Sequence, residues 1–354
     1  MMLEYDRGRH MRVLFIYEQG QPLQAIHQLQ CCAKAIRERF EGARIIFATN
    51  NSIPDVDVSW ADKVYSTIAV KVQTNHEADG PWKHLHSAGW TDPNVRQTVY
   101  QSWSMLTRKL KPDCILTSGA QSAMLVAVLE GIRVIQVGDS QLVADIKDWP
   151  EISNFPELEH WLYHITGKTA GQLLDKPGVV FGAKDLDRDR SGLILRAAHD
   201  LVGVGQKTFK GKALAVWDDR HPHTDVLVEK GKHLWGDDFA LVGPDEAFSD
   251  GFSIESIAEA APLIITQYDM LWSSKAIELG LPLFGSALRR YQVGIGERAE
   301  QGRLSYGLGE DMQMLDDYHQ DSFVFEAWAK ARSEGAVGKF CDLGVALHAL
   351  LEKR

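Results

Sequence analysis

"LIITQYDMLWSSKAIELGLPLFG", residues Leu263–Gly285, is the stretch of sequence that decides the fold. An apolar run ends at a Thr, a segment of helical spacing follows, a Gly closes it, and a second apolar run begins. The stretch "CILTSGAQSAMLVAVLEGIRVIQVG", residues Cys114–Gly138, has the same order, and in both the closing Gly comes fourteen positions after the Thr. Short apolar runs are typical of buried parallel strands, and Gly is typical of helix ends. Each stretch therefore predicts a strand, a turn, a helix and a second strand.

The chain around these two stretches continues the same alternation. Apolar runs at 11–19 and 43–50 flank a segment of helical spacing, and runs at 213–219 and 239–246 begin a second series. Residues 223–235 fit either a strand or a helix. Alternating strands and helices predict parallel sheets with helices on both faces. We therefore expect an α/β protein with two Rossmann-like domains facing each other across a cleft, and a single extended sheet is the alternative.

These domains are expected to divide the chain into three parts. Residues 1–170 form the N-terminal Rossmann-like domain, residues 171–330 form the C-terminal one, and residues 331–354 form a C-terminal helix. We expect the connection between the domains near 203–212, where Gly and Lys are concentrated.

Composition argues against several classes of protein. The 354 residues carry a formal net charge of -10 and no Lys/Arg stripe, so the usual footprint of a nucleic-acid-binding protein is missing. No apolar run approaches the roughly 18 residues of a transmembrane helix. Four cysteines without C-x-x-C spacing, and a charged N-terminus, predict a cytoplasmic protein. Peripheral association with a membrane stays open, as does the oligomeric state.

Several motifs that would indicate a particular chemistry are missing. No G-x-G-x-x-G follows the first predicted strand, and the chain has neither a Walker A sequence nor H-E-x-x-H. A dinucleotide-dependent dehydrogenase, a P-loop ATPase and a zincin-type metalloprotease are therefore disfavoured. We expect no resident cofactor and no bound metal.

Candidate binding residues lie just past the predicted strands, because ligands of open parallel sheets bind at the carboxyl ends of the strands. Amide and hydroxyl side chains suit sugar hydroxyls, and Gly allows a backbone to approach a phosphate closely. In the first half the candidates for substrate binding are Gln19, Gly20, Ser118, Gly119 and Gln121.

The most polar strand end is "WDDRHPHTD", residues Trp217–Asp225. Two carboxylates, an arginine and two histidines follow an apolar run directly. Arg220 matches a phosphate with bidentate geometry, and His221 is a potential donor to one. We interpret this segment as contacting a ligand, with a purely structural turn as the alternative.

Three features together resemble the GT-B glycosyltransferases. These are two Rossmann-like halves, the pair His221–Pro222 after a strand of the second half, and the late segment in which Thr266 precedes Gly280 and Pro282. The likeness is to capsule-polysaccharide and Kdo-transferase-type enzymes, which use nucleotide-activated sugars. In the family pattern a Gly and a Glu occupy the helix where this chain has Ser273 and Lys275.

The resemblance implies transfer of a sugar from a nucleotide donor, held by the second half, to a glycan or other hydroxyl acceptor held by the first. It implies a role in polysaccharide biosynthesis that needs no metal. For donor binding it implies His221 and Pro222, together with Thr266, Gln267 and the start of the helix near Ser273. The other candidates for donor binding lie past strands of the second half or beside these residues, and they are Arg220, Gly243, Tyr268, Ser274 and Lys275.

An inverting transfer needs a general base near the acceptor. Asp139, at the end of a predicted strand, is the preferred candidate, and Glu18 and His223 are the others. A polar segment with three histidines, at 76, 84 and 86, is a further candidate for contact with the substrate. An ordinary surface loop is the alternative for that segment.

Three other functions stay open from the sequence. A nucleotide-sugar epimerase of the same architecture would use the carboxylates and histidines of Trp217–Asp225. A glycosyltransferase that modifies DNA bases would need a nucleic-acid acceptor, which the negative charge disfavours. A two-lobed protein that binds a small molecule without turnover is the third.

Overall fold

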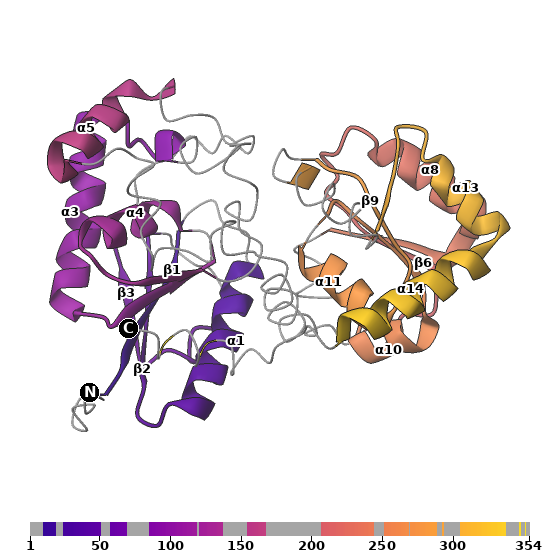
Figure 1. Ribbon diagram of the computed structural model, residues 1–354, viewed down its shortest axis with the longest axis horizontal. Helices are drawn as coiled ribbons and strands as arrows, with labels where there is room; N and C mark the ends of the chain where they lie inside the picture. Colours follow the sequence, from indigo (N-terminus) through magenta and orange to yellow (C-terminus); the bar gives the residue numbers. More distant parts are fainter. Residues whose placement is uncertain are drawn as a thin grey trace.

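The computed structural model describes residues 10–18, 24–50, 57–68, 85–118, 120–136, 154–167, 207–243, 251–268, 270–288, 292–293, 305–337, 347 and 351. Within them, Figure 1 shows two α/β units, one built from the first part of the chain and one from the second. None of the helices in the described ranges is long and apolar enough to cross a membrane.

The first unit is a parallel sheet of five strands in the order β3-β2-β1-β4-β5. The strands are β1 (Arg12–Tyr17), β2 (Arg44–Thr49), β3 (Lys63–Ser66), β4 (Cys114–Thr117) and β5 (Val134–Gln136). Its helices are α1 (Gln24–Arg39), α3 (Pro93–Leu110), α4 (Gln121–Leu129) and α5 (Pro156–Thr166).

The second unit is a parallel sheet in the order β10-β9-β8-β6-β7. The strands are β6 (Ala213–Val216), β7 (Phe239–Val242), β8 (Leu263–Thr266), β9 (Leu283–Gly285) and β10 (Tyr306–Gly307). Its helices are α8 (Thr224–Trp235), the 3-10 turn η5 (Gly236–Asp238), α10 (Ile254–Ala260), α11 (Met270–Leu279), α13 (Gln313–Gln320) and α14 (Ser322–Val337). The ambiguous segment 223–235 is thus a helix.

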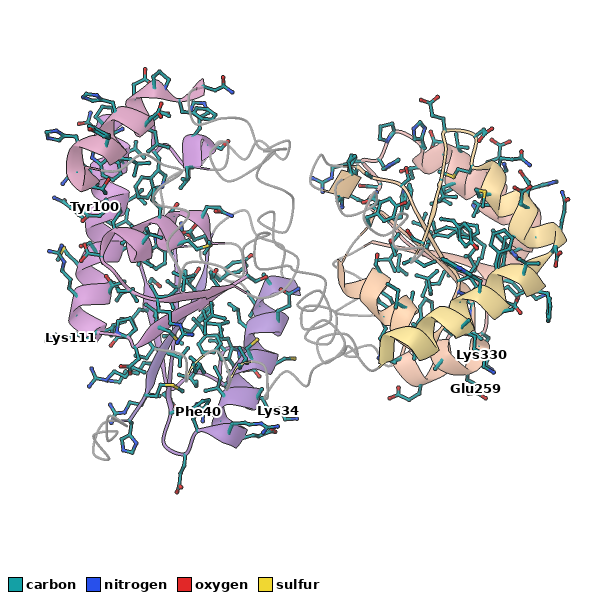
Figure 2. All side chains as sticks on the ribbon, in the orientation of Figure 1. Lys34, Phe40, Tyr100, Lys111, Glu259 and Lys330 are labelled. Atoms are coloured by element: carbon teal, nitrogen blue, oxygen red, sulfur yellow. The ribbon has the colours of Figure 1, made fainter. Side chains whose placement is uncertain are left out.

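The central strands of both sheets are buried on both faces, which explains the continuous apolar runs in the sequence. In β1, Leu14 and Ile16 belong to the core shared with α3 and α4, whereas Val13 and Phe15 belong to the core shared with α1. The second sheet alternates in the same way between a core with α11 and a core with α8 and α13. Figure 2 shows these side chains filling the space between each sheet and its helices.

The two units repeat one arrangement. The order β2-β1-β4-β5 in the first sheet corresponds to β7-β6-β8-β9 in the second. Thr117 pairs with Ile16 in the first unit, and Thr266 pairs with Val216 in the second. The glycines that close α4 and α11 have φ of 69° and 68°, a left-handed conformation that favours Gly. The prediction of two Rossmann-like domains is confirmed.

The structure describes one of the two predicted domain boundaries, the one at 330/331. The boundary at 170/171 lies outside the described residues, between α5 and β6. Helix α14 runs without a break across position 330, where the sequence analysis began a separate C-terminal helix. Leu347 packs in the core of the first unit, and Arg133 donates to the carbonyl of Leu351 over 3.4 Å. The end of the chain therefore returns to the first unit.

Candidate functional site

Glu18 follows β1 at the carboxyl edge of the first sheet and is only 7% exposed. Its two carboxylate oxygens accept hydrogen bonds from the backbone N–H groups of Ser122 (3.0 Å) and Ala123 (2.8 Å), in the first turn of α4. A helix N-terminus attracts negative charge, because its N–H groups point outward without intrahelical partners. These hydrogen bonds lower the pKa of Glu18, but burial has the larger effect and raises it to about 7.

Two further side chains extend the surroundings of Glu18. The hydroxyl of Ser122 also donates to its carboxylate, and the indole Nε1 of Trp90 donates to that hydroxyl over 3.0 Å. Trp90 is fully buried. The carboxylate is therefore held in one position by groups that are themselves fixed.

The raised pKa of Glu18 predicts a specific pH dependence of stability. Between pH 4.5 and 7 the folded protein keeps a proton that the unfolded chain has released, so the free energy of unfolding falls as pH rises through this range. The decrease is on the order of 3 kcal/mol and levels off above pH 7. Urea unfolding of the wild type and of Glu18→Gln across this range measures it. Parallel curves for the two proteins would contradict the assignment.

The predicted substrate residues of the first unit include two that are described. The hydroxyl of Ser118 donates to the side-chain oxygen of Gln28 on α1, and both residues are buried. Gln121 is the first residue of α4 and is 9% exposed. Gln19, Gly20 and Gly119 lie outside the described residues.

In the second unit, Asp218 occupies the position equivalent to Glu18, two residues past the paired strand residue. Its carboxylate binds the guanidinium of Arg220, with Nε at 2.8 Å from Oδ1 and Nη2 on Oδ2. The carbonyl of Asp218 accepts a hydrogen bond from Gln267 over 3.1 Å. The turns after β6 and β8 are thus tied together.

His221 lies beneath this turn and is 4% exposed. Its ring packs 4.5 Å from that of Trp217, and Nδ1 accepts the backbone N–H of His223 over 3.1 Å. Burial holds the pKa of His221 below its usual value, which favours the neutral ring. With Nδ1 as the acceptor, this network assigns the proton to Nε2. Nε2 lies 3.4 Å from the hydroxyl of Ser286, just past β9.

The turn after β8 is shaped by Thr266. Its hydroxyl oxygen accepts the backbone N–H of Tyr268 over 3.1 Å and lies 3.2 Å from the hydroxyl of Ser273 on α11. Tyr268 adopts a φ of 56°, which is uncommon for a residue other than Gly. Its ring lies over Gly285, where a Cβ would come within 2.4 Å of the ring. Gly285 therefore fits this position because a larger side chain would displace Tyr268.

The other predicted donor residues differ in exposure. Lys275 is only 3% exposed on the inner side of α11, while Pro222 is exposed. Gly243 is half-buried just past β7, and Ser274 lies on α11 next to Lys275. The burial of Lys275 is the described fact about it, and its part in donor binding stays a prediction.

The predicted catalytic residues do not form one described cluster. Glu18 belongs to the first unit, His223 begins α8 in the second, and Asp139 lies outside the described residues. Sequence reasoning missed Ser122, Trp90 and Gln28. The sequence pattern could have identified Gln28, because it is a polar residue on the apolar stripe of α1 formed by Ala25, Leu29 and Cys32.

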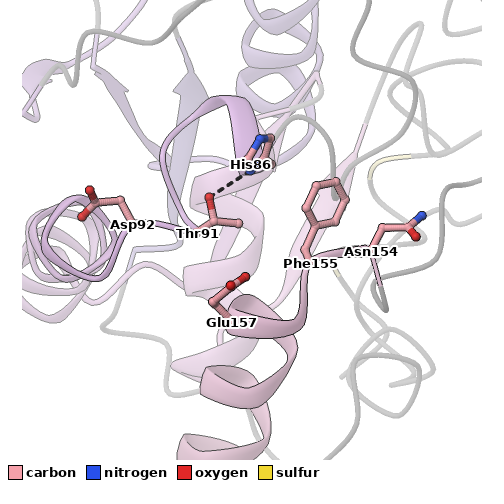
Figure 3. Close-up of a pocket in the computed structure, with 6 residues that line it drawn as sticks. All are labelled: His86, Thr91, Asp92, Asn154, Phe155 and Glu157. Carbon is pink, nitrogen blue, oxygen red and sulfur yellow. Dashed lines mark hydrogen bonds between the residues drawn. The ribbon is translucent and has the colours of Figure 1, made fainter.

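A cavity of about 520 Å³, widely open to solvent, is present at the surface of the first unit, in addition to these strand ends. Its lining residues come from the starts of α3 and α5 and from the turn before α3 (Figure 3). They are His86, Thr91, Asp92, Asn154, Phe155 and Glu157. His86 is one of the histidines predicted to contact substrate, while His76 and His84 lie outside the described ranges.

Within the described part of the chain, no group of three or more His, Cys, Asp or Glu side chains is arranged to hold a metal ion. Cys114 is a free thiol. The thiol of Cys114 is buried in the first sheet, and burial raises its pKa to about 12.

Comparison with known proteins gives structural neighbours over nearly the whole chain. A Streptomyces sp. SF2575 glycosyltransferase, SsfS6, solved with thymidine diphosphate, has a TM-score of 0.59 at 14% identity, with 98% of this chain and 100% of that chain covered. The glycotransferase of kitacinnamycin has a TM-score of 0.61 at 14% identity, covering 97% and 98%. No family model and no curated protein matches the sequence.

The chain has the GT-B fold. At this level of identity the likeness establishes the architecture, and function has to be argued from the site. A third neighbour shows that proteins of this architecture are described with different functions. A structure described as a UDP-N-acetylglucosamine 2-epimerase from Listeria monocytogenes has a TM-score of 0.58 at 14% identity, covering 97% of this chain and 95% of that chain.

Proposed function

We propose that the protein is a glycosyltransferase that moves a sugar from a nucleotide-activated donor, bound by the second unit, to a hydroxyl acceptor bound by the first. The observation that carries this proposal is that the acidic side chains at two equivalent strand ends bind different partners. In the first unit Glu18 occupies the N-terminus of α4, whereas its counterpart Asp218 turns to Arg220. We place the diphosphate of the donor at the start of α11, because a helix N-terminus attracts anions.

The side chains next to α11 suit a diphosphate. His221 directs its Nε2 toward Ser286, and Gln267 and Ser273 add amide and hydroxyl groups at the same edge of the sheet. Uncharged donors fixed by packing stabilise the charge that develops on a departing phosphate. The neighbours solved with thymidine diphosphate support a nucleotide ligand in this fold.

In the proposed reaction the acceptor oxygen attacks the anomeric carbon of the donor sugar. A new carbon–oxygen bond forms, the bond from that carbon to the phosphate oxygen breaks, and the nucleoside diphosphate leaves with the electron pair. The hydroxyl proton passes to a base. Glu18 is the described residue that fits this role, because burial places its pKa at about 7. Asp139 and His223 stay predictions for the same role.

The finer parts of the proposal come from the sequence resemblance. They are an acceptor of the capsule-polysaccharide or Kdo type, a role in polysaccharide biosynthesis, and a cytoplasmic location. Donor residues on this proposal include Arg220, which would exchange its bond with Asp218 for a phosphate contact.

A thermal-shift screen tests the proposal. A ligand that binds only the folded state raises the melting temperature according to its affinity and concentration. We expect a shift with nucleoside diphosphates and nucleotide sugars of one base family. The absence of a shift with thymidine, uridine, guanosine, adenosine and cytidine nucleotides would overturn the donor site.

Chelation provides a separate prediction. We expect sugar transfer to be unchanged within about twofold by excess EDTA, because His221, Gln267 and the start of α11 supply the phosphate contacts without a bridging cation. Initial rates with and without EDTA measure this. A loss of more than tenfold that Mg²⁺ or Mn²⁺ restores would assign the diphosphate to a metal.

An epimerase is the second candidate, favoured by the neighbour described as a UDP-N-acetylglucosamine 2-epimerase. The two functions differ in their need for an acceptor. Incubation with a nucleotide sugar alone, followed by analysis of the nucleotide and sugar products, separates them. Conversion of the donor sugar without any acceptor would favour the epimerase.

A further inference from the structure

The cavity between α3 and α5 has a chemistry that the proposed donor site does not use. Figure 3 shows His86, Phe155 and Asn154 on one side of it, and Asp92 and Glu157 on α3 and α5. The rings of His86 and Phe155 stack with their centroids 5.1 Å apart and their planes at 28°. The cavity thus combines an aromatic surface with carboxylate, amide and hydroxyl groups.

The walls of the cavity are fixed by local hydrogen bonds. Asp92 caps α3 by accepting the backbone N–H groups of Asn94 (2.8 Å) and Val95 (3.1 Å) through one carboxylate oxygen. His86 Nδ1 lies 2.9 Å from the hydroxyl of Thr91. The carbonyl of Phe155 accepts the N–H of Leu158 at the start of α5. A site with walls held in this way loses little entropy on binding.

The charges around the cavity favour a neutral ligand over an anion. Asp92 and Glu157 bring negative charge to its lining. The cation behind them, Arg96, is buried, donates to the carbonyl of Trp90 over 3.0 Å and lies 5.1 Å from the ring of Trp161. Arg96 interacts electrostatically with both Asp92 and Glu157 and offsets one of their two negative charges, so a net negative charge remains to oppose an anionic ligand.

The cavity is also connected to Glu18. Thr91 in its lining follows Trp90 directly, and the indole of Trp90 donates to Ser122, whose backbone N–H donates to the carboxylate of Glu18. Thr91 and the proposed base Glu18 are thus linked through two residues, Trp90 and Ser122.

We propose that this cavity binds a neutral, hydroxyl-rich ring of the acceptor, with the ring packed on His86 and Phe155 and its hydroxyls donating to Asp92 and Glu157. Aromatic faces offer apolar surface to the C–H groups of a sugar, and carboxylates accept from its hydroxyls. This inference rests on the proposed function, because it assigns the acceptor to the unit that carries Glu18.

Saturation-transfer NMR tests the proposal with methyl β-D-glucopyranoside and with the methyl glycosides of galactose, mannose and rhamnose. Methyl β-D-glucuronide is the anionic counterpart. We expect saturable binding of at least one neutral glycoside, and binding of the glucuronide at least about tenfold weaker than that of methyl glucoside. Absence of binding by all neutral glycosides, or equal binding of the glucuronide, would overturn the proposal.

Two variants locate the binding. His86→Ala removes an exposed ring of the stack, and we expect it to raise the dissociation constant of the glycoside at least fivefold. Glu157→Lys should reduce the preference for the neutral ring over the glucuronide. Glu159→Lys makes the same change on α5 outside the lining and should leave this preference unchanged. An unchanged dissociation constant in His86→Ala, or equal effects of the two lysine variants, would place the sugar elsewhere.

The melting temperature with nucleotides, measured on the same samples, separates this inference from the proposed function. A nucleotide shift without glycoside binding overturns the cavity proposal alone. Glycoside binding at His86 without any nucleotide shift overturns the transferase and leaves a sugar-binding cavity.

Discussion

Replacement of His221 by Asn is expected to raise the dissociation constant of the nucleotide about ten- to a hundredfold while the fold is retained. The Asn side-chain oxygen can still accept the backbone N–H of His223, as Nδ1 does in the wild type. The Nε2 donor is lost, and a hydrogen bond to a charged group is worth roughly 1.5–3 kcal/mol. Calorimetric titration with the nucleotide found in the thermal-shift screen measures the change.

Two further variants distinguish a binding role of His221 from a structural one. His221→Ala removes both ring nitrogens and leaves the N–H of His223 without its partner, so we expect it to lower stability as well as affinity. His233→Asn, in the last turn of α8 and exposed, is the matched control and should change neither. If His221→Asn lowers stability by as much free energy as it lowers affinity, the residue is structural.

Replacement of Glu18 by Gln is expected to lower kcat by about 10²- to 10⁴-fold, the usual contribution of a general base. Gln nearly matches the shape of Glu but does not accept a proton at neutral pH. In the wild type, kcat/KM should rise with pH and level off above about 7, because the carboxylate of Glu18 forms in that range. Initial rates from pH 5 to 9 measure both effects.

Glu130→Gln is the control for this experiment. Glu130 lies at the other end of α4 and accepts hydrogen bonds from Arg108, Tyr100 and Ser104. Its replacement should lower stability but leave kcat per folded molecule unchanged. Near-normal turnover by Glu18→Gln would show that the carboxylate serves only to cap α4.

Much of the fold could be predicted because its signals are local. Apolar runs marked the strands, and the common spacing from Thr to Gly matched the two units. Ser253 is a residue type that favours the first position before a helix, and it caps α10 by accepting the N–H of Ser256. Segment 223–235 could not be assigned, because its own pattern does not distinguish strand from helix and its packing beside β7 and α13 decides.

The site was only partly predictable. The His221–Pro222 strand end was identified from its sequence, but the bond between Asp218 and Arg220 and the burial of Lys275 were not. The cap on α4 joins residues 104 positions apart, so nothing near Glu18 in the chain signals it. Arg220 and Lys275 looked alike as phosphate-binding cations, and only their surroundings distinguish them.

By itself the sequence determined two α/β units, their repeated order of strands and helices, and the strand ends that carry polar residues. The spacing of apolar residues encodes this information within a few turns of chain. Only the tertiary structure decided which helix terminus is filled by Glu18, which proton state burial favours for Glu18 and His221, and where a cavity forms between α3 and α5. These properties depend on desolvation and on partners brought together from distant parts of the chain.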